Sequence, residues 1–180
     1  MIEKSQLQHL VEVMDRLRSS GGCPWDAQQT HESLLTYLIE ESYEFIDAVE
    51  RSDRADMLEE LGDILLQVVF HARIASEESG AAFDIEDVAK GISNKLISRH
   101  PHVFSEEKQL TPSEVEVNWE KIKSAEKDRK SAGDGVPLGQ PALALAAKLI
   151  HRAKKHGERA EPVVEIKNPQ IVDQTTIGDL

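Results

Sequence analysis

The fold follows from one stretch, residues 58–74, which reads LEELGDILLQVVFHARI. Apolar residues recur in this stretch at helical spacing, so we expect one long helix. Its polar residues fall on a single narrow column, and apolar residues fill the other faces. The column consists of Glu60, Asp63, Gln67 and His71. A polar column bordered by apolar residues predicts a helix that is buried nearly all round and carries a functional groove.

Helical periodicity continues along the chain, and no strand-like alternation occurs before about residue 160. The sequence therefore predicts an all-α fold of five or six helices. Asp53 and Asp84 are expected N-caps, and Thr111-Pro112-Ser113-Glu114 supplies an N-cap, a first-turn proline and a capping-box glutamate. The expected helices cover about residues 7–17, 30–51, 53–79, 84–99, 111–130 and 141–156.

Glycines and prolines after residue 130 indicate a linker. We expect a domain over residues 1–130, a linker over 131–140, a C-terminal helix over 141–157 and a tail over 158–180. The chain of 180 residues is long enough for one ordinary globular domain.

Charge and cysteine content limit the function classes. The chain has 33 acidic and 21 basic side chains, a net charge of -12, which argues against a nucleic-acid polymer as a partner. Cys23 is the single cysteine, so an intrachain disulfide or a thiolate zinc cluster does not fit. The most apolar run, residues 64–72, is too short for a membrane span, and the opening residues lack an apolar signal core. We expect a cytoplasmic protein without a membrane partner.

Five carboxylates form the informative constellation. Glu40, Glu41 and Glu44 share one arc of the helix over 30–51, and Glu60 and Asp63 lie one turn apart on the next helix. Two antiparallel helices could bring all five together. Like charges at such spacings repel one another, so a shared cation would compensate. Carboxylate oxygens suit Mg²⁺, with Mn²⁺ as the alternative ion.

A simpler interpretation is a solvated acidic face, and for the helix over 30–51 the spacing alone favours it. The three glutamates lie almost opposite one apolar arc, as on an ordinary surface helix. That arc consists of Leu35, Leu38, Ile39, Ser42, Phe45, Ile46 and Val49. Three rival sites lack support in the sequence. A ferritin-like di-iron site needs a Glu-x-x-His pair, a P-loop NTPase needs its glycine-rich loop, and a zinc helix needs His-Glu-x-x-His, and none of these motifs is present.

The acidic signature, Glu40-Glu41-Ser42-Tyr43-Glu44 followed by Glu60-Leu61-Gly62-Asp63, resembles that of the MazG-type nucleoside triphosphate pyrophosphohydrolases, an all-α NTP pyrophosphatase group. Further stretches match this family in the same order, and together they cover about residues 5–155. They are residues 22–26 (GCPWD), 60–70 (ELGDILLQVVF), 95–104 (KLISRHPHVF) and 119–123 (WEKIK).

The resemblance implies Mg²⁺-dependent hydrolysis of NTPs or dNTPs to the monophosphate and pyrophosphate. It also implies a helical bundle completed by homo-oligomerisation, as a homodimer or tetramer, and a housecleaning role in the nucleotide pool. Many family members carry two tandem domains, whereas the signature occurs once in this chain. The alternative from another class is a non-catalytic nucleotide-binding or regulatory module whose acidic face serves assembly.

Site residues follow from the resemblance, position by position. Glu41, Glu44, Glu60 and Asp63 would ligate Mg²⁺ and carry the catalysis, with Glu40 as a further ligand or an orienting group.

Basic and aromatic residues of the resemblance would bind the nucleotide. Lys95 and Arg99 resemble the family's phosphate-binding pair, although such spacing alone is typical of an exposed helix end. Trp119 would lie by the base or sugar and Lys123 by the phosphates, with a core anchor as the other interpretation of Trp119. Tyr37, one turn before Glu41, is expected at the edge of the site, where nucleotide contact and packing are both open.

Overall fold

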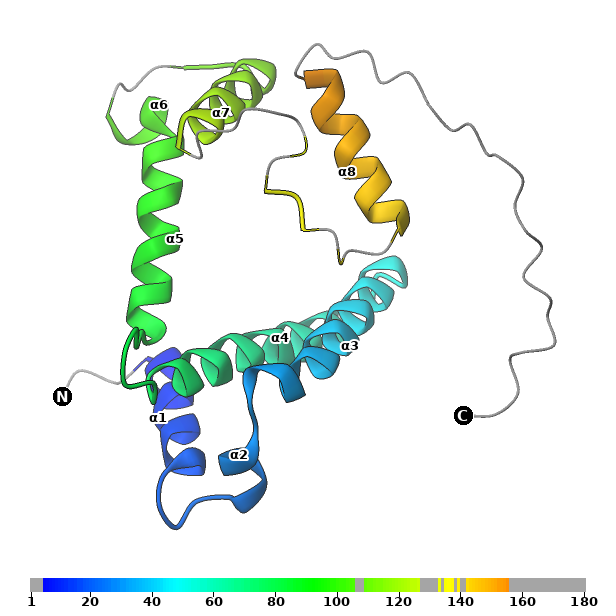
Figure 1. The fold of residues 1–180 in the computed structure, drawn as a ribbon. Coiled ribbons are helices and arrows are strands. Elements are labelled where there is room, and N and C mark those ends of the chain that lie inside the picture. Colours follow the sequence, from blue (N-terminus) through cyan, green and yellow to red (C-terminus); the bar gives the residue numbers. More distant parts are fainter. Residues whose placement is uncertain are drawn as a thin grey trace, which may run out of the picture. The chain divides into compact units, whose positions relative to one another are not determined.

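The computed structural model describes residues 5–105, 109–126, 133, 135–137, 139 and 142–155. Every regular element in these residues is a helix, so the all-α prediction is confirmed (Figure 1). The helices are α1 (Gln6–Arg18), α2 (Pro24–Gln28), α3 (His31–Glu50), α4 (Arg54–Ala75), α5 (Ile85–Arg99), α6 (Pro101–Phe104), α7 (Pro112–Glu126) and α8 (Ala142–Lys155).

The chain divides into two compact units, Met1–Gln109 with α1 to α6 and Leu110–Leu180 with α7 and α8. The domain predicted over 1–130 and the linker predicted over 131–140 stay predictions. The tail predicted over 158–180 lies outside the described residues. Among the described helices, none combines the length and the apolar composition that crossing a membrane requires.

Helix starts follow the capping chemistry of the sequence. Asp53 caps α4 by accepting hydrogen bonds from the backbone N–H groups of Ala55 and Asp56 at 3.0 and 3.2 Å. Asp84 caps α5 in a reciprocal box with Asp87. Both predicted caps are therefore confirmed. A third pair, Thr30 and Ser33, forms an equivalent box at the start of α3.

The capping box predicted for α7 is also present. The Thr111 backbone N–H donates to the Glu114 carboxylate at 2.9 Å, and the Glu114 N–H donates to the Thr111 hydroxyl at 3.4 Å. Pro112 begins the helix, where its missing N–H costs nothing. α7 ends at Glu126, and residues 127–130 of the predicted helix lie outside the described part of the chain.

Two short helices lie outside the predicted helical ranges. α2 begins at Pro24, and α6 begins at Pro101 directly after α5. In both, proline fixes the helical φ angle of the first residue, so one turn forms without a side-chain cap.

α4 is shorter than predicted, ending at Ala75 instead of near residue 79. The Ser76 hydroxyl donates to the backbone carbonyl of Arg73 at 2.7 Å, and the N–H of Glu77 turns to the carbonyl of Ile74 at 3.0 Å. Such local bonds tighten the last turn and compete with the α-helical pattern.

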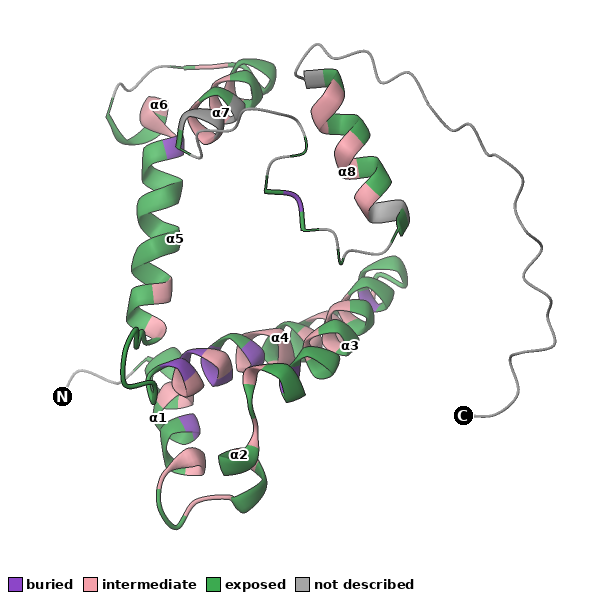
Figure 2. Cartoon of the chain, viewed as in Figure 1, coloured by how far each residue is buried: buried purple, intermediate pink, exposed green. Residues whose placement is uncertain are grey.

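The core of the first unit lies where α1, α3 and α4 meet. Its buried members are Met14 from α1, Leu34 from α3, and Val69 and Phe70 from α4. Figure 2 shows buried positions gathered on one half of α4, with Met14 buried on α1, whereas α5 is exposed along most of its length. This small core fixes one end of the α3–α4 pair.

Arg18 ties α1 to α4 beside this core. Its Nε and Nη2 atoms donate to the two carboxylate oxygens of Glu77 at 3.0 and 2.8 Å. Its Nη1 donates to the backbone carbonyls of Asp26 and Gln29, and its guanidinium lies 5.5 Å from the ring centroid of Phe70. Such a two-pronged Arg–carboxylate contact fixes orientation as well as distance.

α3 and α4 form an antiparallel pair joined by a tight turn. Ser52 adopts a left-handed φ of 57° in this turn. Arg51 neutralises three acids around it, with nitrogen–oxygen distances of 2.7 Å to Asp47, 3.6 Å to Asp53 and 2.7 Å to Asp56. The ion pairs of Arg51 therefore stabilise the turn between α3 and α4.

The outer face of α4 contradicts the expectation that the helix over 58–74 is buried nearly all round. Leu58 is 76% exposed, and Leu61 and Val68 are exposed as well. The apolar arc of α3 is also largely exposed, since α3 turns the face that carries Glu41 toward α4. Its exposed members are Leu35, Ile39, Ile46 and Val49. Two adjacent helices thus leave apolar surface uncovered by the described residues of the first unit.

Candidate metal site between α3 and α4

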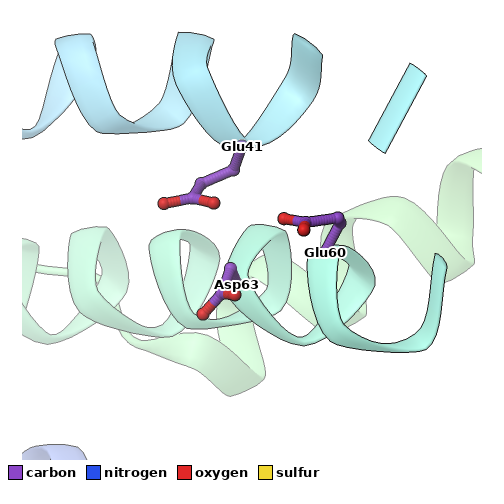
Figure 3. Close-up of side chains that lie close together, drawn as sticks. All are labelled: Glu41, Glu60 and Asp63. Carbon is purple, nitrogen blue, oxygen red and sulfur yellow. The ribbon is translucent and has the colours of Figure 1, made fainter. Parts of the chain in front are cut away.

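Three carboxylates converge on the seam between α3 and α4. Glu41 comes from α3, and Glu60 and Asp63 lie one turn apart on α4. Each offers a carboxylate oxygen, and these oxygens all lie within 4.8 Å of one another. Figure 3 shows Glu41 reaching from its helix toward the other two. All three side chains are half-buried, so the cluster is accessible from solvent.

Helical periodicity explains why Glu41 faces α4. It follows the buried Leu34 by seven residues and precedes the buried Ala48 by seven, which places all three on one stripe of α3. On a helix that packs against one neighbour, this stripe is normally apolar throughout. A carboxylate at such a position is costly unless it gains a partner there.

The remaining two predicted ligands border the cluster. Glu44 and Glu40 are exposed, and their charges contribute to raising the pKa of Glu41. The charge of Glu44 also contributes to raising the pKa of Glu60. The three-residue cluster does not include them, yet they add to the negative potential around it.

Burial and repulsion disturb the protonation of the cluster. Partial burial is the largest cause that raises the pKa of Glu41, followed by the charge of Asp63. The pKa of Glu60 is raised in the same order of causes, first by loss of solvent and then by the charge of Glu44. In the absence of a cation, these two glutamates would therefore bind protons more readily than an isolated glutamate does.

Basic side chains neutralise acids elsewhere in the first unit and leave this cluster alone. Arg51, Arg73 and Arg18 form ion pairs with other acids. Within the described residues, no ion pair with Lys or Arg involves Glu41, Glu60 or Asp63. An all-oxygen donor set with uncompensated charge fits a hard divalent cation.

Apart from Tyr37, which lies on α3 with Glu41, the predicted nucleotide-binding residues lie on helices other than α3 and α4. Tyr37, 39% exposed, is one turn before Glu41, and its ring meets the ring of Trp25 edge-on at 6.1 Å between centroids. Lys95 is exposed on α5, and Arg99 near the end of that helix is buried. Figure 1 shows α5 leading away from α3 and α4. Of these three residues, Tyr37 shares a helix with a cluster residue, and the roles of Lys95 and Arg99 stay predictions.

Trp119 and Lys123 lie one turn apart on α7, in the second unit. Both side chains are half-buried, and both take part in polar or ring contacts. Their assignment to the nucleotide stays a prediction.

Sequence reasoning missed one contact of the seam. It placed His71 at the end of the polar column but did not single out His31, whose ring meets that of His71 across the seam. The signal was available in principle, since pairing residue 41 with residues 60–63 in antiparallel helices also pairs residue 31 with residue 71.

Comparison with known proteins identifies the family. Residues 29–104 match the MazG nucleotide pyrophosphohydrolase domain. The chain is 43% identical to the Thermotoga maritima nucleoside triphosphate pyrophosphohydrolase/pyrophosphatase MazG, covering 96% of this chain and 71% of that protein. It is 49% identical to the nucleoside triphosphate pyrophosphohydrolase of Mycobacterium tuberculosis, covering 84% of this chain and 46% of that protein. Against several curated relatives the chain spans less than two thirds of their length, between 28% and 65%.

A solved structure agrees in fold. The mazG-related protein from Thermotoga maritima is 31% identical, with a TM-score of 0.55, over 65% of this chain and 98% of that one. Sequence and structure therefore agree that this chain belongs to the MazG nucleotide pyrophosphohydrolase family.

Proposed function

We propose that this chain hydrolyses nucleoside triphosphates, NTP or dNTP, to the nucleoside monophosphate and pyrophosphate in a divalent-metal-dependent reaction. The cluster of Glu41, Glu60 and Asp63 carries the proposal, since its oxygens lie within 4.8 Å of one another in a chain of the MazG family. The names of the relatives support the substrate class. The reaction would clear the nucleotide pool, in the reducing cytoplasm that a lone Cys23 suits.

The ion we propose is Mg²⁺, with Mn²⁺ as the alternative. Glu41, Glu60 and Asp63 would hold it, and Glu44 and Glu40 would complete the acidic border. Bound there, the ion would neutralise phosphate charge and lower the pKa of a coordinated water. The half-buried position of the three carboxylates leaves room for phosphate oxygens and water on the solvent side.

In the proposed reaction, a water oxygen forms a bond to the α-phosphorus. The bond from that phosphorus to the oxygen that bridges to the β-phosphate breaks, pyrophosphate leaves, and one proton is released. Five acidic side chains around the seam disfavour a bare polyphosphate, so the nucleotide would bind as its metal complex. The work of this chain is therefore to position charge and substrate.

Further residues would bind the nucleotide. Lys95 and Arg99 would neutralise phosphate charge, and Lys123 would add a cation. Trp119 would stack on the base or sugar, and Tyr37 would contact the nucleotide at the edge of the site. The exposure of Tyr37 and its place one turn before Glu41 support that last assignment.

Self-association is part of the proposal. The exposed apolar arc of α3 and the exposed residues Leu58, Leu61 and Val68 of α4 form the kind of surface that a second copy of the chain covers. A homodimer or tetramer would bury these side chains and complete the bundle.

Light scattering coupled to size exclusion tests the assembly. The wild type should elute as a dimer or tetramer, and Leu58→Glu with Leu61→Glu should shift it toward the monomer. Exposed acidic substitutions elsewhere, for example Gln28→Glu on α2, should leave the mass unchanged. A wild type that stays monomeric at all concentrations would contradict the assembly.

Pyrophosphate release from a panel of NTPs and dNTPs, with Mg²⁺ and with chelator, tests the activity. We expect stoichiometric monophosphate and pyrophosphate with Mg²⁺, and neither product with chelator. Nucleotide that binds but stays intact under both conditions would instead support a non-catalytic nucleotide-binding or regulatory module.

A further inference from the structure

His31 and His71 face each other across the seam between α3 and α4. Their Nδ1 atoms are 2.7 Å apart, and the two ring planes differ by 1°. The ring centroids are 5.0 Å apart, longer than the nitrogen distance by about two ring radii. The two nitrogens therefore lie on the line between the rings, which meet edge to edge in one plane. This is the geometry of a hydrogen bond between two imidazoles.

Only one of the two Nδ1 atoms can carry a proton in this bond, and burial indicates which. The Nε2 atom of His71 is buried and has no hydrogen-bond partner. A buried N–H without a partner is rarer than a buried acceptor without one, so this nitrogen is the bare one. His71 then donates from Nδ1 to the Nδ1 of His31. Burial is the largest cause that lowers the pKa of His71, which favours a neutral ring.

The pair lies in the same helical register as the carboxylates. His31 precedes Glu41 by ten residues, and His71 follows Asp63 by eight. Ten helical residues correspond to about 15 Å along the axis. Neither residues 31–41 nor residues 63–71 contain glycine or proline, so each helix is continuous between the imidazole and the carboxylate. A shift of α3 along α4 at the histidine pair would therefore also shift Glu41 relative to Asp63.

The carboxylate cluster needs contacts elsewhere on the two helices to hold it together, because its own charges repel one another. Glu41, Glu60 and Asp63 repel one another, because carboxylate oxygens of the three lie within 4.8 Å of one another. The apolar contacts of Leu34 and its neighbours favour proximity but are not directional, whereas a hydrogen bond loses its strength within a small displacement. At the far end, Arg51 ties the turn.

We propose that the hydrogen bond between His31 and His71 is a positioning device that sets the register of α3 against α4 and so holds Glu41 within ion-sharing distance of Glu60 and Asp63. It acts through the helices and touches neither ion nor nucleotide. The inference rests on the metal site of the proposed function.

Two substitutions of similar shape distinguish the effect of the His31–His71 hydrogen bond from the effect of side-chain packing at position 31. His31→Asn places an amide oxygen where the imidazole Nδ1 lies, so it can still accept from His71. His31→Leu has the same branching without an acceptor. Position 31 is the first residue of α3 and only half-buried, which limits the cost of either change.

The readout is Mn²⁺ affinity of the folded, nucleotide-free protein, measured from the electron paramagnetic resonance signal of free Mn²⁺. We expect His31→Asn to bind within twofold of the wild type and His31→Leu to bind about tenfold more weakly, the low end of the range for residues that orient metal ligands. A merely structural role would lower the melting temperature of His31→Leu and leave the affinity of its folded fraction unchanged. Equal affinity of all three proteins, or equal loss in both variants, would overturn the inference.

A spectroscopic measurement on the wild type does not depend on the variants folding. With ¹⁵N-labelled histidine, we expect the protonated nitrogen of His71 to be Nδ1 and that of His31 to be Nε2. A scalar coupling between the two Nδ1 nuclei should cross the hydrogen bond. Absence of this coupling, or a proton on Nε2 of His71, would overturn the inference even if His31→Leu fails to fold.

The two proposals fail in different ways. Wild type that binds no Mn²⁺ contradicts the proposed metal site and with it the positioning role. Wild type that binds Mn²⁺ with the same affinity as His31→Leu contradicts the positioning role alone.

Discussion

Glu41 and Asp63 come from different helices, and their carboxylate oxygens lie within 4.8 Å of each other across the seam between α3 and α4. The antiparallel register that produces this approach also places His31 against His71. Near the other end of the pair, Arg51 fastens the connecting turn. The candidate site is therefore a property of one helical hairpin, and changes within the hairpin test it.

Acid–base behaviour of the metal-free protein should report on the cluster. Both Glu41 and Glu60 have a pKa raised above the ordinary value of 4.5 in the folded state. Their contribution to stability is fully present below the unfolded pKa and is lost as pH rises through the folded pKa. In chelator, the free energy of unfolding of the wild type should therefore fall relative to that of Glu41→Gln between pH 4 and pH 7.

Urea denaturation at several pH values measures this difference, and Mg²⁺ at pH 7 should reverse it for the wild type. Parallel pH curves for wild type and Glu41→Gln in chelator would contradict the account, because they would mean that the pKa of Glu41 is not raised in the folded state.

Removing one border carboxylate should separate activity from stability. We expect Glu44→Ala to lower the rate of pyrophosphate release by at least about a hundredfold, since the metal complex loses a charge partner. Its melting temperature in chelator should not fall, because the change removes a charge from a crowded acidic region. A variant that melts early and keeps its turnover per folded molecule would show that Glu44 is structural.

The turn between α3 and α4 should be improved by glycine. Ser52 has a φ of 57°, a region that costs an L-residue about 1–2 kcal/mol, and glycine would remove this cost. Part of the gain is offset because glycine has more conformational freedom in the unfolded chain. We expect Ser52→Gly to raise the free energy of unfolding by about 0.5–1 kcal/mol.

Ser20→Gly is the matched control, since Ser20 lies in the turn after α1 without a left-handed φ. It should lower the free energy of unfolding or leave it unchanged. The prediction for Ser52 fails if both substitutions have the same sign and size.

Arg18 should be irreplaceable by lysine. The side chain is 5% exposed and donates to both oxygens of Glu77 and to two backbone carbonyls. A single ammonium cannot reach these acceptors together, so Arg18→Lys should cost about 2–4 kcal/mol of unfolding free energy.

Arg18→Lys should also change how the free energy of unfolding falls at acidic pH, which is the acid limb of the stability curve. Hydrogen bonding to Arg18 is the largest cause that lowers the pKa of Glu77, so its stabilisation is present above the unfolded pKa and is lost as pH falls through the folded pKa. Arg18→Lys should weaken this dependence. A lysine variant with wild-type stability at pH 7 and an unchanged acid limb would contradict the role of Arg18.

Local signals in the sequence predicted most of the fold. Caps at Asp53, Asp84 and Thr111 depend on residues within three or four positions, so they could be read without tertiary structure. The end of α4 was misplaced because Arg18, far away in sequence, pairs with Glu77 and because Ser76 bonds its own turn.

The candidate site was predicted only in part. Periodicity placed the acids of α3 opposite its apolar arc, and an ordinary surface helix would then turn the acids to solvent. The structure does the reverse: Glu41 faces α4, while Leu35 and Ile39 are exposed. The pattern of one helix cannot reveal this inversion, because it depends on the second helix and, in our proposal, on a second copy of the chain.

The most direct test of the shared ion compares two neighbouring glutamates of α4. Glu60 belongs to the carboxylate cluster, whereas Glu59 is exposed on the same helix and lies outside it. Mn²⁺ should be titrated into nucleotide-free wild type, Glu60→Gln and Glu59→Gln. The account predicts that Glu60→Gln loses at least about tenfold in affinity while Glu59→Gln binds like the wild type. Equal affinity of the two variants would contradict a metal site at Glu41, Glu60 and Asp63.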